Sequence, residues 1–239
     1  MNYFSFKKLY LHPTKNKSIY FLLVFFATFF SLGSINALAE NASQSVNEPL
    51  ILLSKQLGDL NTFQGDFEQV ITDEDGDVVE ENEGEFLLKR PGFFRWYIKP
   101  PFEKLMVSNN KTIWTYDPDL KQATADVVDD RLLQTPMLLL SGDLEQIRLN
   151  YSVSISNSND KKNNTLDLQR YKLVPKNDDG LFEWMEIIFS NDRVVGMTLF
   201  SELGEIQRYT FSETQQNKKI DDSKFTFDVP ADVDVIVND

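Results

Sequence analysis

The chain has 239 residues and a formal net charge of −13, with 37 acidic against 24 basic side chains. It contains no cysteine, and its single histidine is His12. These counts exclude thiol nucleophiles, dithiol redox chemistry and, beyond residue 12, any His-based triad or zinc site of the usual ligand sets. They also disfavour nucleic-acid binding, which needs a basic surface. Paired-carboxylate hydrolysis stays open, but we expect no enzyme, no metal and no cofactor.

Residues 1–39 are typical of a cleavable export signal. Four lysines precede the apolar run 19–32, namely Lys7, Lys8, Lys15 and Lys17. Ala37-Leu38-Ala39 then supplies the small residues that a signal peptidase recognises. An uncleaved anchor is the alternative, but the run is shorter than the roughly 17 to 25 residues that a bilayer requires. We therefore expect one soluble domain at 40–239, with 20 basic against 37 acidic residues and a net charge of −17.

The exported part begins with helical periodicity and then changes to strand periodicity. Asn47 can cap a helix with Pro49 in its first turn. Its apolar stripe consists of Val46, Leu50, Leu53, Leu57 and Leu60. From Thr62 the period is two, with Phe63, Phe67 and Ile71 on one face. The acidic run 73–77 fits a hairpin turn better than a calcium loop, because its spacing departs from the EF-hand pattern. The return strand is expected from Phe86.

An aromatic segment follows at residues 89–118. Phe94, Trp96 and Ile98 alternate with Phe93, Arg95 and Tyr97, so both faces of this strand carry aromatic side chains. Such a strand belongs either to a sandwich core or to a sheet whose second face covers something apolar. Asn109-Asn110 fits a tight turn between two further strands, because asparagine tolerates a positive φ.

The remainder predicts more strands, for a total of about ten, interrupted once by helical residues. The later strands are expected at 149–155, 166–174, 183–190, 193–201 and 205–214. The interruption spans 126–147, where Thr135-Pro136 begins a helix and Gly142 ends it. Its apolar residues are Met137, Leu138, Leu139, Leu140 and Leu144. This helix is either permanent core or a lid that covers a cavity and can leave it.

These motifs, in this order, resemble the periplasmic outer-membrane lipoprotein carriers of the LolA type. The matching residues are the leucine-striped helix, Phe63-x-Gly-x-Phe67-x-Gln69, Gly84-x-Phe86, Lys89-Arg90-Pro91, Phe94 and Trp96, Val107-Ser108, Trp114-x-Tyr116, Gln122-Ala123, Thr135-Pro136 with Leu138 to Leu140, Leu173-Val174-Pro175 and Lys224-Phe225-Thr226-Phe227. The tract 157–164 and the acidic tail after Pro230 match least.

The resemblance implies a fold that is mainly β with helices: an incomplete, unclosed antiparallel β-barrel of about ten or eleven strands, with a helical lid over an apolar cavity. It also implies a monomeric periplasmic carrier without cofactor. Such a carrier takes acylated lipoproteins from an ATP-driven inner-membrane exporter and delivers them to an outer-membrane receptor.

Site residues are implied as well. Arg90 is expected as a lid lock, because its guanidinium offers five donors in a fixed fork for carbonyls at the ends of the lid helices. Candidates for lining the cavity are Phe94, Trp96, Ile98, Leu105, Val107, Ile113 and Trp114, although strand alternation means that some must face away. Phe94 is expected either to be plain core packing or to handle cargo at the mouth of the cavity.

Three other classes stay open. A periplasmic half-barrel that senses lipids or lipoproteins would generally carry a second domain. The outer-membrane receptor of the same pathway would need a cysteine for its lipid anchor, and the chain has none. A hydrolase acting on envelope glycans would need converging carboxylates in an open polar cleft.

Overall fold

The computed structural model describes residues 48–128, 140, 144–156, 168–177 and 182–238. The chain divides into the units 1–36 and 37–239, and all described residues belong to the second. Within the described residues, no helix is both long and apolar enough to cross a bilayer. The predicted signal, the cap at Asn47, Val46 and the tract 157–164 lie outside the described residues.

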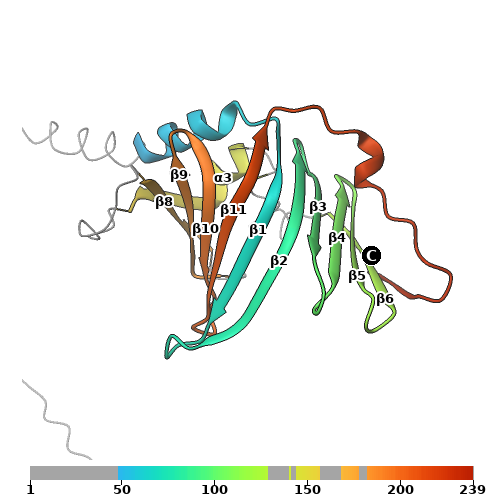
Figure 1. Cartoon of the computed structure of the whole chain (residues 1–239). Helices are drawn as coiled ribbons and strands as arrows, with labels where there is room; N and C mark the ends of the chain where they lie inside the picture. Colours follow the sequence, from blue (N-terminus) through green and yellow to red (C-terminus); the bar gives the residue numbers. More distant parts are fainter. Residues whose placement is uncertain (1–47, 129–139, 141–143, 157–167, 178–181, 239) are drawn as a thin grey trace, which may run out of the picture. The chain divides into compact units, whose positions relative to one another are not determined.

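One sheet contains all twelve described strands (Figure 1). They are β1 (Thr62–Thr72), β2 (Val78–Lys89), β3 (Phe93–Ile98), β4 (Lys104–Asn109), β5 (Thr112–Asp117), β6 (Gln122–Val127), β7 (Tyr151–Ile155), β8 (Leu168–Pro175), β9 (Trp184–Ser190), β10 (Arg193–Phe200), β11 (Ile206–Gln216) and β12 (Asp234–Asn238). Their order is β12-β6-β5-β4-β3-β2-β1-β11-β10-β9-β8-β7. β7 and β12 are the two edges, so the prediction of an unclosed sheet is confirmed, with twelve strands rather than ten or eleven.

Turn chemistry explains two of the hairpins. Asp73 Oδ1 accepts hydrogen bonds from the backbone N–H groups of Asp75 and Asp77, at 3.1 and 2.9 Å, which makes the acidic run a turn as predicted. Asn110 has a φ of 69°, and Asn109 Oδ1 accepts from the N–H groups of Lys111 and Thr112. The Asn109-Asn110 hairpin is therefore confirmed.

Three strands differ from the sequence prediction. β6 lies where no strand was expected, and its last two residues fall within the interruption predicted at 126–147. β2 begins at Val78 rather than at Phe86, because its acidic first half pairs with β1 along the whole strand and thereby satisfies its backbone groups. β12 was not predicted, and it pairs parallel to β6, with Asp234 opposite Gln122 and Asn238 opposite Asp126. All five of its residues are exposed, so it lacks the buried apolar alternation by which the other strands were recognised.

Helices cover one face of the sheet, which we call the helix face (Figure 1). Residues 48–58 form the N-terminal helix, in which Leu53 and Leu57 are fully buried and Leu50 packs against the same core. The short helix α3 (Leu144–Asn150) adds the buried Ile147. The predicted leucine stripe is thus confirmed at its described positions.

A C-terminal segment, residues 217–233, leads from β11 to the region of β5 and β6 (Figure 1) and packs against the opposite face, where Phe225 meets Phe93 and Phe227 meets Trp114. We call this segment the strap and the surface beneath it the strap face. The strap contains the 3-10 helix η2 (Asp222–Phe225), whose Phe225 is 1 % exposed and lies 5.6 Å from Phe93, measured between ring centroids. Ion pairs to Lys89 and Lys121 hold it at Asp222 and Asp232.

Candidate functional site

Strand pairing divides the seven predicted lining residues between the two faces. Phe94, Trp96, Ile98 and Ile113 belong to the helix face, where they join the core shared with the helices. Leu105, Val107 and Trp114 point to the strap face, because Leu105 pairs with Tyr97, and Val107 with Arg95 and Trp114. Directly paired residues lie on the same side of a sheet. These three are therefore the candidates that face away from the helix face, as strand alternation required of some of the seven.

The strap face explains why those three positions are apolar. The Phe227 ring lies 5.5 Å from that of Trp114 and 5.4 Å from that of Tyr116, measured between centroids. Val107 is only 1 % exposed, and Ala123, opposite Tyr116 on β6, is fully buried. The two-sided aromatic strand thus has a core on each face, one beneath helices and one beneath the strap.

On the helix face, aromatic rings form one continuous cluster. The rings of Phe67 and Trp96 are stacked, with centroids 4.0 Å apart and planes inclined by 25°. Phe86 stacks against the same Trp96 at 5.7 Å, and Tyr209 and Phe211 meet it edge-on at 5.7 and 6.5 Å. Offset and edge-to-face contacts of this kind stabilise beyond the area that they bury. The cluster is a large, rigid apolar surface at the centre of the sheet.

Gly84 makes the central stack possible. A Cβ atom at this position would lie 2.3 Å from the Phe67 ring and 2.1 Å from the Tyr97 carbonyl oxygen. Phe67 is paired directly with Gly84 across the strands, so the ring occupies the space that a side chain would fill. The Gly84-x-Phe86 motif therefore supplies a gap and then a ring on the same face.

Arg90 lies in the turn between β2 and β3 and contacts both the N-terminal helix and the helical residue Leu140. Its Nη1 donates a hydrogen bond to the Leu57 carbonyl oxygen at 2.7 Å, and its Nε donates to the Leu140 carbonyl oxygen at 3.1 Å. Leu57 is in the last turn of the N-terminal helix, where carbonyl groups lack partners within the helix. One guanidinium thereby joins the sheet, the N-terminal helix and Leu140.

The predicted lid residues are only partly described. Leu140 is helical, 1 % exposed and part of the helix-face core, and Leu144 packs against that core from α3. Leu144 also lies 3.7 Å from the position that a Cβ of Gly58 would take, which brings α3 against the end of the N-terminal helix. Met137, Leu138 and Leu139 lie outside the described residues.

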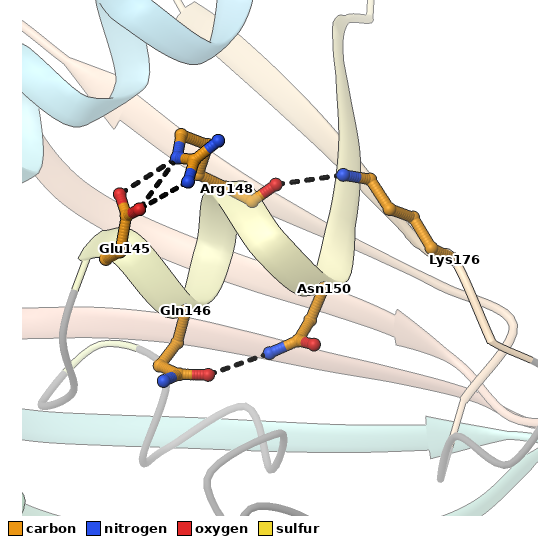
Figure 2. Close-up of polar contacts among 5 residues, drawn as sticks. All are labelled: Glu145, Gln146, Arg148, Asn150 and Lys176. Atoms are coloured by element: carbon orange, nitrogen blue, oxygen red, sulfur yellow. Dashed lines mark hydrogen bonds and ion pairs between the residues drawn. The ribbon is translucent and has the colours of Figure 1, made fainter.

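Helix α3 is fastened to the neighbouring strands at its C-terminal end (Figure 2). Lys176 Nζ donates to the Arg148 carbonyl oxygen at 2.9 Å, and the Lys176 backbone N–H donates to the Asn150 carbonyl oxygen at 2.9 Å. Within the helix, Arg148 pairs with Glu145 three residues earlier. The hydrogen bonds from Arg148 lower the pKa of the Glu145 carboxyl. A cation at the carbonyl end of a helix is also favoured by the helix dipole.

Sequence reasoning missed a buried polar network on the helix face. Gln69 and Asn82 face each other on β1 and β2, each is 7 % exposed, and Asn82 Nδ2 donates to Gln69 Oε1 at 2.9 Å. Gln69 Nε2 donates to the Tyr209 hydroxyl oxygen at 2.8 Å. Burial raises the pKa of Tyr209, and the Glu80 carboxylate raises it further. The available signal was Gln69, which stands two residues after Phe67 and so on the apolar face of its strand.

Three pockets formed by described residues have walls in which polar and apolar surface are about equal. One of about 320 Å³ lies beside the N-terminal helix, where Gln56 Nε2 donates to Gln169 Oε1 at 2.9 Å and to Asp192 Oδ1 at 3.0 Å. Two others are lined by residues of β1 and β2. Among the described residues, no group of three or more His, Cys, Asp or Glu side chains could hold a metal ion.

Comparison with known proteins places this architecture in a family. Residues 58–228 match the family model described as "Outer membrane lipoprotein carrier protein LolA". The outer-membrane lipoprotein carrier protein of Pseudomonas aeruginosa is 36 % identical over 205 residues, covering 84 % of this chain and 95 % of that protein. That of Azotobacter vinelandii is 37 % identical over 205 residues, covering 86 % and 96 %. A solved LolA superfamily protein from Nitrosomonas europaea is 11 % identical, covers 75 % and 98 %, and gives a TM-score of 0.44. The chain belongs to the LolA family of outer-membrane lipoprotein carrier proteins.

Proposed function

We propose that the chain is a periplasmic carrier that shields the acyl chains of lipoproteins and delivers them to the outer membrane. The observation that carries this proposal is the aromatic helix face, covered by helices that a single arginine holds in place. The relatives named above are called lipoprotein carriers, and a mobile apolar cover over an apolar surface is what such a carrier requires.

The aromatic helix face suits the task of shielding acyl chains from water. Exposing one acyl chain of about 14 methylenes to water costs on the order of 11 kcal/mol, at about 0.8 kcal/mol per CH₂. A soluble carrier has to shield most of that area. In the described residues the helix face is packed by the chain's own side chains, so acyl chains enter as the helices move away from Trp96 and Phe67.

Arg90 provides a reason why cargo can leave again. Its two hydrogen bonds to helix carbonyls form only when the helices lie on the sheet, so the empty form is stabilised relative to the loaded form. The free energy of closure then offsets part of the affinity for acyl chains, and transfer to a receptor runs downhill. Phe94, 3 % exposed on the same face two residues before Trp96, takes part in handling the cargo.

The partners in this scheme are an ATP-driven exporter in the inner membrane and a receptor at the outer membrane. The carrier works as a monomer, after cleavage of the export signal behind Ala39. It needs neither a catalytic group nor a cofactor, because it moves its cargo without making or breaking a covalent bond.

Gentle purification of the chain from the periplasm tests the proposal. Native mass spectrometry should find the mature protein bound to polypeptides that carry N-terminal acyl groups, and depletion of the protein should leave lipoproteins in the inner membrane. Recovery of only the bare protein, together with unchanged lipoprotein sorting after depletion, would contradict it.

A further inference from the structure

On β2, β1 and β11 the apolar part of the helix face has a sharp end, whereas on β10 it continues to Leu199. On β1 the inward-facing positions change from Phe67 to Gln69, and on β2 they change from Gly84 to Asn82. Gln69 pairs with Asn82 on one side and with Tyr209 on the other, so the three form a row across β2, β1 and β11. This row is perpendicular to the strands and lies directly beyond the aromatic cluster.

Tyr209 is the boundary residue. Its ring belongs to the cluster, with its centroid 5.7 Å from that of Trp96 and 6.3 Å from that of Phe67. Its hydroxyl belongs to the polar row, because it accepts from Gln69 Nε2 at 2.8 Å and donates to Gln207 Oε1 at 3.1 Å. One side chain therefore separates the apolar surface from the hydrogen-bonded one.

An acyl chain lying on the cluster cannot advance into this row without a penalty. Its terminal methyl would displace amide and hydroxyl groups from each other and offer no hydrogen bond in return, and a buried polar group without a partner is costly. The row is also held together by three strands, so it cannot yield as a flexible loop would. It acts as a stop.

The distance to this stop matches a common acyl chain. From Leu88, two residues before Arg90, to Asn82 the strand advances about 20 Å at about 3.4 Å per residue. That is similar to the length of a fully extended palmitoyl chain. We propose that the row of Asn82, Gln69 and Tyr209 sets the depth to which an acyl chain enters and so selects lipoproteins with chains up to about palmitoyl length. The inference rests on the proposed function and adds a specificity to it.

The test is competition among lipopeptides that differ only in acyl length. Dimyristoyl, dipalmitoyl and distearoyl glyceryl-cysteine peptides are mixed in equal amounts in micelles of a nonionic detergent, and the purified full-length mature protein is loaded from them. Native mass spectrometry then gives the composition of the bound fraction. The micelle provides every chain with an equally apolar alternative, so the ratio reports only what the carrier can accommodate.

Wild-type protein should take up the first two lipopeptides about equally and the distearoyl form roughly tenfold less for each of its chains that reaches the row, because the two extra methylenes of such a chain find no apolar place. In a triple variant, Tyr209→Phe with Gln69→Leu and Asn82→Leu, the distearoyl form should recover to within about twofold. The two amides are replaced together so that neither is left unpaired.

Tyr209→Phe alone, which keeps the ring and removes the hydroxyl, serves if the triple variant does not fold. It should raise the bound share of the distearoyl lipopeptide, as the triple variant does. Tyr97→Phe is the matched control, since it removes a tyrosine hydroxyl that donates to Glu103 Oε1 at 3.1 Å on the strap face. Tyr97→Phe should bind the three lipopeptides in the same proportions as the wild type.

The outcomes separate the two claims. If the wild type loads distearoyl and dipalmitoyl peptides equally, or if the variants keep the wild-type profile, the row is not a depth limit although the carrier function stands. If no lipopeptide of any length is taken up, the carrier function fails, and the depth limit fails with it.

Discussion

Arg90 Nη1 donates a hydrogen bond to the Leu57 carbonyl oxygen at 2.7 Å, which fastens the last turn of the N-terminal helix to the turn after β2. The same guanidinium reaches the Leu140 carbonyl oxygen. Because both acceptors are main-chain atoms, substitutions at residues 57 and 140 would leave this link in place. Only a change at Arg90 removes it.

Arg90→Leu should therefore slow the release of cargo without affecting its loading. Losing two hydrogen bonds lowers the free energy of unfolding by about 1–3 kcal/mol, while the aromatic face that holds acyl chains is untouched. We expect the variant to accept cargo normally and to pass it to a purified receptor much more slowly. Arg95→Leu, which changes an arginine on the strap face, is the control. Unchanged delivery by Arg90→Leu would refute the lock.

Phe94→Glu should impair cargo handling. Phe94 is 3 % exposed on the helix face, where a carboxylate would be desolvated and would repel acyl chains. We expect a strong loss of lipopeptide binding, measured together with thermal unfolding to establish that the protein is folded, and a near-normal result for Phe94→Leu. Phe102→Glu changes a phenylalanine that is 58 % exposed and should have little effect. A folded Phe94→Glu protein that carries cargo normally would exclude the proposed role.

Gly84→Ala should be unusually destabilising for the addition of one methyl group. The new Cβ would overlap the Phe67 ring and the Tyr97 carbonyl oxygen, and overpacking of this kind costs about 1–3 kcal/mol or more. Urea unfolding followed by tryptophan fluorescence measures the loss. Gly58→Ala is the matched control, because among the described residues its Cβ meets only Leu144, at 3.7 Å. Equal stability of the two variants would show that the Phe67 ring can move away from β2 at little cost.

Phe225→Ala should release the strap from the sheet. Phe225 is 1 % exposed, and truncation of a buried phenylalanine costs about 3–5 kcal/mol when its surroundings cannot collapse. Because the strap covers Phe93 and Val107, we expect increased binding of a hydrophobic dye and faster proteolysis within 217–233. Phe227→Ala tests the same strap over Trp114, with a smaller expected effect. Absence of dye binding would mean that the strap stays in place without its anchor.

The Glu145–Arg148 pair predicts a pH dependence of α3. Arg148 lowers the pKa of the Glu145 carboxyl below its usual 4.5, so the pair stabilises the helix above that pH and stops doing so as the pH falls through the lowered value. Carboxyl carbon NMR during an acid titration should find the midpoint of Glu145 below 4.5. In Arg148→Leu the midpoint should rise. An identical midpoint in both proteins would show that the pair does not form in solution.

The sequence by itself determined the local elements of this protein. The leucine spacing of the N-terminal helix, the two-residue alternation from Thr62 onward and the Asn109-Asn110 turn depend on neighbours within a few residues, and each was confirmed. The same alternation showed that both faces of β3 are apolar. It could not say what covers each face, because a period of two carries no information about partners far away in the chain.

Only the tertiary structure decided that Leu105, Val107 and Trp114 lie under the strap, since this depends on the register of β3, β4 and β5 and on where residues 217–233 return. It likewise brought Gln69, Asn82 and Tyr209 into one row, because β1 pairs with a strand some 140 positions later in the chain. The position of Arg90 against the Leu57 and Leu140 carbonyl groups has the same origin. The resemblance implied that Arg90 would meet carbonyl groups at helix ends, but side-chain patterns cannot say which carbonyl groups these are, so Leu57 and Leu140 became known only from the fold.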